Sequence, residues 1–346
     1  VSNSPNPPSR AKARDRKTLL LDTHIHPSAL QRLIEEAHVL TDHDASTDQV
    51  LALLPQAHGL ILGSKLTVGA TEMDLGQKLE VIGRHGVGID NVNQAAASER
   101  GIPFVYTPYG PTESTAEHAL LLMLATARRL SQLDHAVRTG HFGIRQEAEA
   151  MGHELDGKTL GVVGFGRIGQ RLAEMCRDAL HMTVHVFDPY LDRETVAAWG
   201  AVHEDNLDEL ARKVDVLSIH TPLTSETHRL IHQGVIQAMK PASILINASR
   251  GPVVDQIALT KALQEGHLGG AGLDVFDPQP PTLDDPLLQF DQVVLSPHVA
   301  SFTHEGRERM GLTVVEDVLC VLRGERPRYL ANPDVWARRR YPQTSA

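Results

Sequence analysis

Three glycines at the end of an apolar, strand-like run are spaced Gly164-x-Gly166-x-x-Gly169, and a helical pattern follows at once. Gly164 permits a tight turn, Gly166 lets a ligand approach the backbone, and Gly169 lets helix and strand pack closely. A second apolar run ends in Asp188, 19 positions after Gly169, where a carboxylate can accept hydrogen bonds from ribose hydroxyls. A glycine turn without a ligand is the structural alternative, but strand, turn, helix, strand and acid occur here in the required order. The motif therefore predicts a dinucleotide site, with the pyrophosphate at the helix N-terminus.

Arg250 and His298 are the side chains best suited to bind an acid and to move a proton. Arg250 comes just after a strand-like run that ends near Asn247, and His298 follows another such run and a proline. Ligands of doubly wound sheets bind at the carboxyl ends of the strands. There a planar guanidinium suits a two-pronged grip on a carboxylate, and an imidazole exchanges a proton near neutral pH. The alternatives are that Arg250 is a surface arginine on a glycine turn and that His298 has only a structural role.

Strand-like and helix-like segments alternate along the chain, which predicts an α/β fold. Strand-like runs cover residues 19–21, 59–62, 81–83 and 104–106, and later 161–163, 184–187, 216–219, 244–247, 270–275 and 293–295. The later series, with helices between its strands, predicts a doubly wound parallel sheet that starts at the glycine motif. The earlier series predicts a smaller α/β unit.

A long helix is predicted between the two series. Residues 114–117 read Ser-Thr-Ala-Glu, a capping box that would open a helix from His118 to about Val137. Residues 119–125 are apolar on every side of this helix, so it must be buried all round. We favour a helix that is both domain core and subunit interface over one that is core alone. A last helix is predicted from Thr303 to Leu322.

The composition is typical of an intracellular protein with about two domains of ~150 residues each. The chain has 346 residues and a formal net charge of −10, which argues against a general affinity for nucleic acid or an anionic membrane. Its apolar runs stay below the ~18 residues that span a bilayer. Cys176 and Cys320 lie in helix-like apolar patterns and fit neither a disulfide framework nor a metal site. A reducing, cytoplasmic compartment is therefore expected.

Two further features of the sequence are predicted to carry no chemistry. Residues 1–17 lack the apolar segment of a signal peptide and are predicted to be a disordered basic tail. The 19 histidines include the pair His24 and His26, but no further ligands follow at a coherent spacing. We therefore predict no metal.

The order of these motifs resembles the D-isomer-specific 2-hydroxyacid dehydrogenase family, over residues 18 to about 325. The matching segments lie at 86–91, 114–118, 164–169, 220–224, 247–255, 272–276 and 296–298. The resemblance implies an NAD-binding Rossmann domain at 114–301, inserted into a smaller, flavodoxin-like substrate domain at 18–113 plus 302–330. Residues 331–346 would form a C-terminal tail. Family members are usually homodimers built through the region after the capping box.

The resemblance also implies roles for individual residues, with a small 2-hydroxy or 2-oxo acid as substrate. Arg250 would bind the substrate carboxylate, His298 would be the acid/base, and Gln279 would be its partner. Backbone N–H groups in the loop would also meet that carboxylate, at His85, Gly86, Val87 and Gly88. NAD would be bound by Gly164, Gly166, Arg167, Ile168, Gly169, Asp188, His220, Thr221, Pro222, Ala248, Asp274 and His298, with Asp274 on the nicotinamide carboxamide.

Gln279 departs from the family pattern, because most members carry a glutamate there, 29 positions after the arginine. We expect Gln279 to accept a hydrogen bond from the imidazole and to orient it. A neutral amide cannot stabilise an imidazolium by charge, so His298 should lose its proton more readily than a histidine beside a glutamate.

Two alternative functions remain open from the sequence. A formate dehydrogenase has a similar Pro-Gln-Pro segment, and formate oxidation releases no hydroxyl proton, but Pro111 replaces an asparagine of those enzymes. A non-catalytic, NAD-sensing protein like the corepressors of the family is the other alternative, and the retention of Arg250 and His298 argues against it.

Overall fold

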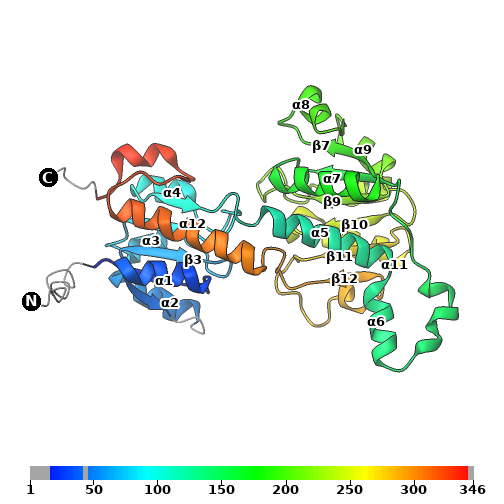
Figure 1. Cartoon of the computed structure of the whole chain (residues 1–346), viewed down its shortest axis with the longest axis horizontal. Coiled ribbons are helices and arrows are strands. Elements are labelled where there is room, and N and C mark those ends of the chain that lie inside the picture. The colour runs from blue at the N-terminus through cyan, green and yellow to red at the C-terminus, as the bar shows by residue number, and fades with distance from the viewer. Residues whose placement is uncertain (1–15, 42–45, 342–346) are drawn as a thin grey trace, which may run out of the picture. The chain divides into compact units, whose positions relative to one another are not determined.

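The structure is a computed structural model that describes residues 16–41 and 46–341. The chain forms two compact units: unit 1 combines the residues up to Pro111 with those from Thr303 onward, and unit 2 is Thr112–Phe302. The predicted domain boundaries, at 113/114 and 301/302, differ from these unit boundaries by one or two residues. Unit 2 is thus inserted into the sequence of unit 1, and the two units are described separately (Figure 1).

In the described part of unit 1, a five-stranded parallel sheet has the order β2-β1-β3-β4-β5. This is the strand order of flavodoxin-like folds. The strands are β1 (Thr18–Leu21), β2 (His38–Thr41), β3 (Gly59–Leu62), β4 (Val81–Arg84) and β5 (Phe104–Tyr106). The helices are α1 (Pro27–Glu36), α2 (Thr47–Leu53), η2 (Leu54–Gln56), α3 (Ala70–Leu75), α4 (Gln94–Glu99), α12 (His304–Leu322) and η7 (Pro333–Arg338).

Alternating side chains of these strands build one core on each face of the sheet. Leu20 packs with residues of α2, α3 and α4, whereas Leu19 and Leu21 pack with residues of α1 and α12. Gly83 marks the closest approach of α12, because a Cβ there would lie 2.7 Å from Val318. Helix α12 therefore packs on a sheet made by residues 18–106, about 200 positions earlier in the chain.

In unit 2, the described residues form a seven-stranded parallel sheet of order β12-β11-β10-β9-β6-β7-β8. Its strands are β6 (Thr159–Val163), β7 (Thr183–Phe187), β8 (Val202–His203), β9 (Val216–Ile219), β10 (Ile244–Asn247), β11 (Gly270–Leu273) and β12 (Val293–Leu295). Counted from β6, the order is that of a dinucleotide-binding fold with one more strand at the end. The predicted fold class is confirmed.

Helices cover both faces of the unit 2 sheet. Residues of α9, α10 and α11 share one core, and residues of α5, α7 and α8 share the other. The α-helices are α5 (Thr112–Ala127), α6 (Leu130–Arg138), α7 (Arg167–Leu180), α8 (Arg193–Ala198), α9 (Leu207–Lys213), α10 (Gln233–Ala238) and α11 (Gln256–Gln264). The 3₁₀ turns are η3 (Phe142–Gln146), η4 (Ala148–Ala150), η5 (Gly251–Val253) and η6 (Pro286–Gln289).

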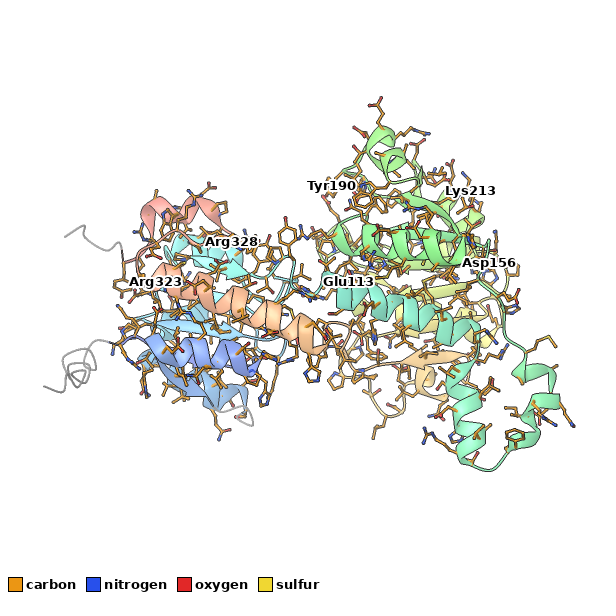
Figure 2. All side chains as sticks on the ribbon, viewed as in Figure 1. Glu113, Asp156, Tyr190, Lys213, Arg323 and Arg328 are labelled. Atoms are coloured by element: carbon orange, nitrogen blue, oxygen red, sulfur yellow. The ribbon has the colours of Figure 1, made fainter. Side chains whose placement is uncertain are left out.

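Ion pairs join helices at the surface of each unit. In unit 1, Arg323 lies 3.1 Å from Glu36 of α1, and in unit 2 Glu113 of α5 lies 2.8 Å from Arg171 of α7. Arg323 and Glu113 are labelled in Figure 2. Exposed pairs of this kind contribute only ~0–1 kcal/mol each. The packing of apolar side chains therefore accounts for most of the stability of each unit.

The predicted capping box is wrong. Helix α5 begins at Thr112, so Ser114 and Thr115 are buried inside its first turns. The predicted single helix also ends early, because the Ala127 carbonyl accepts the backbone N–H of His153 at 2.8 Å. Arg129 then adopts a left-handed conformation, with φ at 52°, and α6 starts as a separate helix.

The predicted C-terminal tail is wrong for residues 331–341. Val335 is fully buried in η7, and the Asn332 side chain accepts the backbone N–H of Phe104 at 2.8 Å. Upstream, the buried Asp317 accepts the N–H groups of Arg328 and Tyr329 at 2.9 and 3.0 Å. These hydrogen bonds hold residue 332 against β5 and residues 328–329 against α12.

The predicted N-terminal tail at 1–17 lies outside the described residues, except for its last two. Of these, Lys17 contacts Glu80 at 2.5 Å, so it is part of the folded unit. Among the described residues, no helix has the length and apolar character needed to cross a membrane.

Candidate active site

The glycine turn between β6 and α7 has the geometry that the sequence predicts. Gly164 has φ at 86°, which glycine adopts without strain. A Cβ on Gly169 would lie 2.4 Å from the Gly164 carbonyl oxygen, so helix and strand could not pack as they do. By contrast, a Cβ on Gly166 would meet no described atom within 4 Å. The turn thus leaves open space at the N-terminus of α7, where Arg167 and Ile168 begin the helix.

Asp188 lies at the mouth of this turn, just after β7. Its two carboxylate oxygens accept the backbone N–H groups of Phe165 at 2.8 Å and Tyr190 at 3.0 Å. A carboxylate has about four acceptor positions, so Asp188 can still receive hydrogen bonds from a ribose diol. The open space at Gly166 and this acid fit the adenosine and pyrophosphate of a dinucleotide.

The end of β9 borders the same turn. A Cβ on Gly164 would lie 2.8 Å from the Thr221 methyl group, so His220, Thr221 and Pro222 adjoin the glycines. Burial lowers the pKa of His220 to about 4, so this imidazole is neutral at physiological pH. The buried Thr221 hydroxyl has no hydrogen-bond partner among the described residues. An unpaired buried hydroxyl is costly, and a bound ligand could satisfy it.

Arg250 follows β10 on a short loop that Asn247 shapes. The buried Asn247 amide donates to the Arg250 carbonyl at 2.9 Å, and its oxygen accepts the Ser249 N–H at 3.0 Å. Ala248 lies inside this loop. At Gly251, a Cβ would lie 1.8 Å from the Phe276 carbonyl oxygen, so only glycine fits. The backbone of Arg250 is therefore held against the end of β11.

Asp274 organises the loop that carries His298. It is fully buried, and its carboxylate accepts the Ser296 hydroxyl at 2.6 Å and the N–H groups of Val299 and Ala300 at 2.9 Å. Burial alone would raise the pKa of the Asp274 carboxyl, but hydrogen bonds, the strongest of them from His118, hold it below its ordinary value. Asp274 is therefore an ionised anchor for residues 296–300.

His298 is held in an unusual backbone conformation by the same anchor. Its φ is 56°, a left-handed value that costs an L-residue ~1–2 kcal/mol. Its N–H donates to the Asp274 carbonyl at 2.8 Å. Strain of this kind persists where the surroundings fix the conformation, and such places are often functional sites.

Gln279 contacts His298, but in the opposite sense to the one we predicted. Its amide nitrogen, which can only donate, lies 2.8 Å from His298 Nδ1. The amide oxygen faces away, toward the Phe276 N–H at 3.4 Å. In the neutral imidazole, Nδ1 is therefore the acceptor and Nε2 carries the hydrogen. The expectation that Gln279 accepts from the imidazole is wrong, because the Phe276 N–H competes for its oxygen.

In unit 1, the segment from His85 to Gly88 follows β4 and is braced by Arg84. The buried Arg84 guanidinium donates to the His85 carbonyl at 2.6 Å and to the Asn91 side chain at 3.1 Å. A Cβ on Gly86 would lie 2.7 Å from this guanidinium. Burial, with Arg307 and Arg84 nearby, lowers the pKa of the His85 imidazole to about 3. His85 is therefore neutral, and the loop with Gly86, Val87 and Gly88 is rigidly supported.

In the structure, most of the predicted site residues of unit 2 lie in two groups. One comprises the glycine turn, Asp188 and the end of β9; the other comprises Asp274, His298 and Gln279. Arg250 lies in the loop that follows β10, the strand between β9 and β11. Three residues with structural roles around Arg250 and His298 were not predicted as site residues: Asn247, Ser296 and His118.

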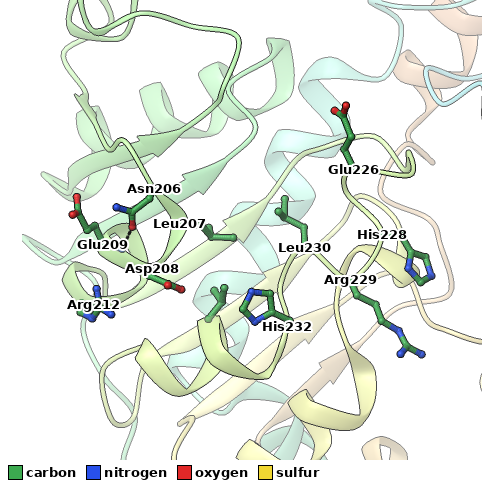
Figure 3. A pocket seen from close by; sticks show the side chains of 11 residues that line it. Asn206, Leu207, Asp208, Glu209, Arg212, Glu226, His228, Arg229, Leu230 and His232 are labelled. Carbon is green, nitrogen blue, oxygen red and sulfur yellow. Dashed lines mark hydrogen bonds between the residues drawn. The ribbon is translucent and has the colours of Figure 1, made fainter.

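A surface pocket of about 540 Å³ also lies in unit 2, between α9 and the segment before α10 (Figure 3). Leu207, Leu230 and Val235 give it an apolar lining, and its charged residues include Arg212 and Arg229. Its lining includes none of the predicted site residues. Among the described residues, no group of three or more His, Cys, Asp or Glu side chains is arranged to hold a metal ion.

The fold and the glycine turn define unit 2 as a dinucleotide-binding α/β domain. Residues 120–300 match the model of the D-isomer specific 2-hydroxyacid dehydrogenase, NAD binding domain. The chain is 40% identical, over 269 residues, to a glyoxylate reductase of Korarchaeum cryptofilum, which covers 78% of this chain and 80% of that protein. This chain belongs to the D-isomer specific 2-hydroxyacid dehydrogenase family, and its cofactor is NAD.

Other relatives differ in length and in cofactor. A D-3-phosphoglycerate dehydrogenase of Archaeoglobus fulgidus is 39% identical over 279 residues, which are 81% of this chain and 52% of that enzyme. The chain thus spans about half the length of this relative. An NADPH-dependent glyoxylate/hydroxypyruvate reductase from Sinorhizobium meliloti, solved with NADP and malonate, is 31% identical. Its TM-score is 0.82, over 96% of this chain and 100% of that chain.

Proposed function

We propose that this chain is an NAD-dependent oxidoreductase that transfers a hydride between nicotinamide and a small D-2-hydroxy or 2-oxo acid. The proposal depends mainly on the placement of Arg250 and His298. Arg250 follows β10 and His298 follows β12, and these strands flank β11 in one parallel sheet. A cation for a carboxylate and an acid/base therefore stand at the edge where such sheets bind ligands.

In the direction of reduction, Arg250 binds the substrate carboxylate with its two-pronged guanidinium and polarises the carbonyl. For the backbone N–H groups of residues 85–88 we keep the role that the family resemblance implies, which is binding of a substrate carboxylate. The bound cofactor supplies the hydride. His298 gives a proton from Nε2 to the oxygen that gains charge, and in the oxidative direction it takes that proton back. The proposal assigns the Asp188 carboxylate to the adenosine ribose, and Asp274 to the nicotinamide carboxamide in addition to its anchoring role.

The experiment that tests this function is NADH oxidation with a panel of acids: glyoxylate, hydroxypyruvate, pyruvate, phenylpyruvate and 3-phosphohydroxypyruvate. We expect turnover with at least one of them. A folded protein that binds NADH but reduces none would contradict the proposal and favour the NAD-sensing alternative.

Formate oxidation is a second candidate, and the Gln279–His298 contact favours it. A hydroxyl proton would have to be taken up by His298, and the neutral Gln279 amide at Nδ1 gives the resulting imidazolium no charge stabilisation. Formate oxidation needs no such base. Formation of NADH from formate alone would support this candidate, and its absence, together with turnover of a 2-oxo acid, would exclude it.

Asp188 is expected to make the enzyme prefer NADH over NADPH by about tenfold or more in kcat/KM. A 2′-phosphate beside this carboxylate would meet a like charge, which costs roughly 1–4 kcal/mol at contact distance. Asp188→Ala should narrow the preference, whereas Asp178→Ala, at an exposed site on α7, should not change it. A wild-type preference for NADPH, as in the Sinorhizobium relative, would overturn this assignment.

We propose that the protein is a homodimer built through the surface of α5 and α6. Large apolar side chains are exposed there: Leu121 and Leu124 on α5, Leu130 and Val137 on α6, and Phe142, which is 64% exposed. Burial of exposed apolar side chains is a common reason for association.

Sedimentation velocity tests the dimer. Wild type should sediment as a dimer, and the double variant Leu130→Asp/Phe142→Asp should sediment as a folded monomer. Ile257→Asp, at another exposed apolar position, should remain dimeric. A monomeric wild type, or a double variant that still dimerises, would show that this surface is not the interface.

A further inference from the structure

The loop that carries Gln279 is held at both ends by one side chain, Gln256. This loop spans residues 277–285, between β11 and η6. The Gln256 amide oxygen accepts the backbone N–H of Asp277 at 2.9 Å, and its amide nitrogen donates to the Asp285 carboxylate at 2.7 Å. Gln256 is the first residue of α11, which starts from an Asp255 cap. A rigid helix thus spans the base of the loop.

The middle of the loop has little packing of its own, so its ends determine where it lies. Leu283 is 93% exposed. Asp285, by contrast, is buried, and its second oxygen accepts the Leu287 N–H at 3.0 Å. Gln279 stands two residues after the Asp277 N–H and reaches His298 from there.

An amide is required at position 256, because the side chain must accept at one end and donate at the other. A glutamate of the same length could accept from Asp277, but it would place a second carboxylate against Asp285. Like charges at that distance repel, and burial of Asp285 strengthens the repulsion. Glutamate at 256 should therefore release one end of the loop.

We propose that Gln256 is a positioning residue that sets the contact between Gln279 and His298. The proposal rests on the proposed function, in which His298 exchanges the substrate proton. Its chemical basis is a continuous chain of contacts: the Gln256 oxygen fixes the Asp277 backbone, which places the Gln279 amide on Nδ1 of the imidazole. Loss of the hydrogen-bond partners that orient metal-bound histidines typically changes activity by about 10–100-fold, and we expect an effect at the lower end of this range here.

Steady-state pH profiles test this chain of contacts. Gln256→Glu is expected to lower kcat/KM about tenfold and to shift the profile onto that of Gln279→Ala. Adding Asp285→Asn to Gln256→Glu should restore the wild-type profile, because the new amide can donate to the glutamate. Gln264→Glu, at an exposed site on the same helix, is the matched control and should leave the profile unchanged. Additive losses in Gln256→Glu/Gln279→Ala would overturn the proposal.

A second measurement does not depend on turnover. In ¹⁵N-histidine-labelled protein, the His298 signal is identified by its absence in His298→Asn, and its Nδ1 shift reports the bond to Gln279. We expect Gln256→Glu and Gln279→Ala to share one shift, distinct from wild type, and Asp285→Asn to reverse the change in Gln256→Glu. A wild-type shift in Gln256→Glu would refute the positioning role.

The two measurements separate the two proposals. If wild type reduces no acid but the shifts change as described, the proposed function fails and the positioning role stands. Should Gln256→Glu fail to fold, Gln256→Leu removes both hydrogen bonds without adding a charge and is judged by the same criteria.

Discussion

Arg250→Lys is expected to lower kcat/KM for reduction of the best 2-oxo acid by at least about 30-fold, or about 2 kcal/mol of transition-state stabilisation. Lysine keeps the positive charge but loses the planar pair of donors that matches a carboxylate. The guanidinium also donates to the Ser249 carbonyl at 2.8 Å, but the loop should keep its backbone, because Asn247 binds the backbone carbonyl of residue 250 and Gly251 packs on backbone atoms. The loss is therefore a measure of guanidinium geometry and not of folding.

Two controls accompany this result. The dissociation constant for NADH, measured by fluorescence titration, should be nearly unchanged in Arg250→Lys. Arg212→Lys, at an exposed arginine of the same unit, should keep wild-type kinetics. If the Arg250→Lys enzyme retains the wild-type kcat/KM, Arg250 does not bind the carboxylate.

Gln279→Glu is expected to move the basic limb of the reduction profile upward by about one pH unit or more. Reduction needs His298 protonated, so its rate falls as pH rises through the histidine pKa. A donating amide at Nδ1 favours the neutral imidazole, whereas a carboxylate there accepts from Nδ1–H and favours the charged form. The substitution should thus keep the acid form available at higher pH, while oxidation should need a higher pH than in wild type.

Profiles of kcat/KM for both directions, in wild type and Gln279→Glu, provide the check. Gln289→Glu, on η6 outside the contact with His298, is a suitable control and should match wild type. Superimposed profiles for wild type and Gln279→Glu would mean that the 2.8 Å contact does not influence the proton.

The parts of the fold that could be predicted from sequence are those with a strong local signal. The fully buried strands β3, β9 and β10 are mostly apolar, and the fold class predicted from such runs is confirmed, as is the family inferred from the sequence motifs. The edge strands β2 and β8 were missed. β8 has only two residues, and both strands contain a polar histidine, His38 or His203, so they lack the apolar pattern of a central strand.

Prediction of the candidate site from sequence was likewise limited to residues with a strong local signal. Glycines, Asp188 and Arg250 are recognisable because each acts through its own residue type in a local motif. Gln256 and Asp285 are 29 positions apart, and nothing in either segment indicates the other. The orientation of the Gln279 amide depends on competition from the Phe276 N–H, which only the folded loop reveals.

The contact at Gly251 also restricts how substrate range can be altered. A side chain there would overlap the Phe276 carbonyl, 1.8 Å from the position of a Cβ. The backbone segments that follow β10 and β11 are therefore in direct contact, with no space between them for a side chain. Libraries that randomise residues 247–251 or 274–276 should therefore yield mostly inactive protein. Within residues 85–88, variation is better directed to the partly buried Val87, because His85 is buried and a Cβ on Gly86 would lie 2.7 Å from the Arg84 guanidinium.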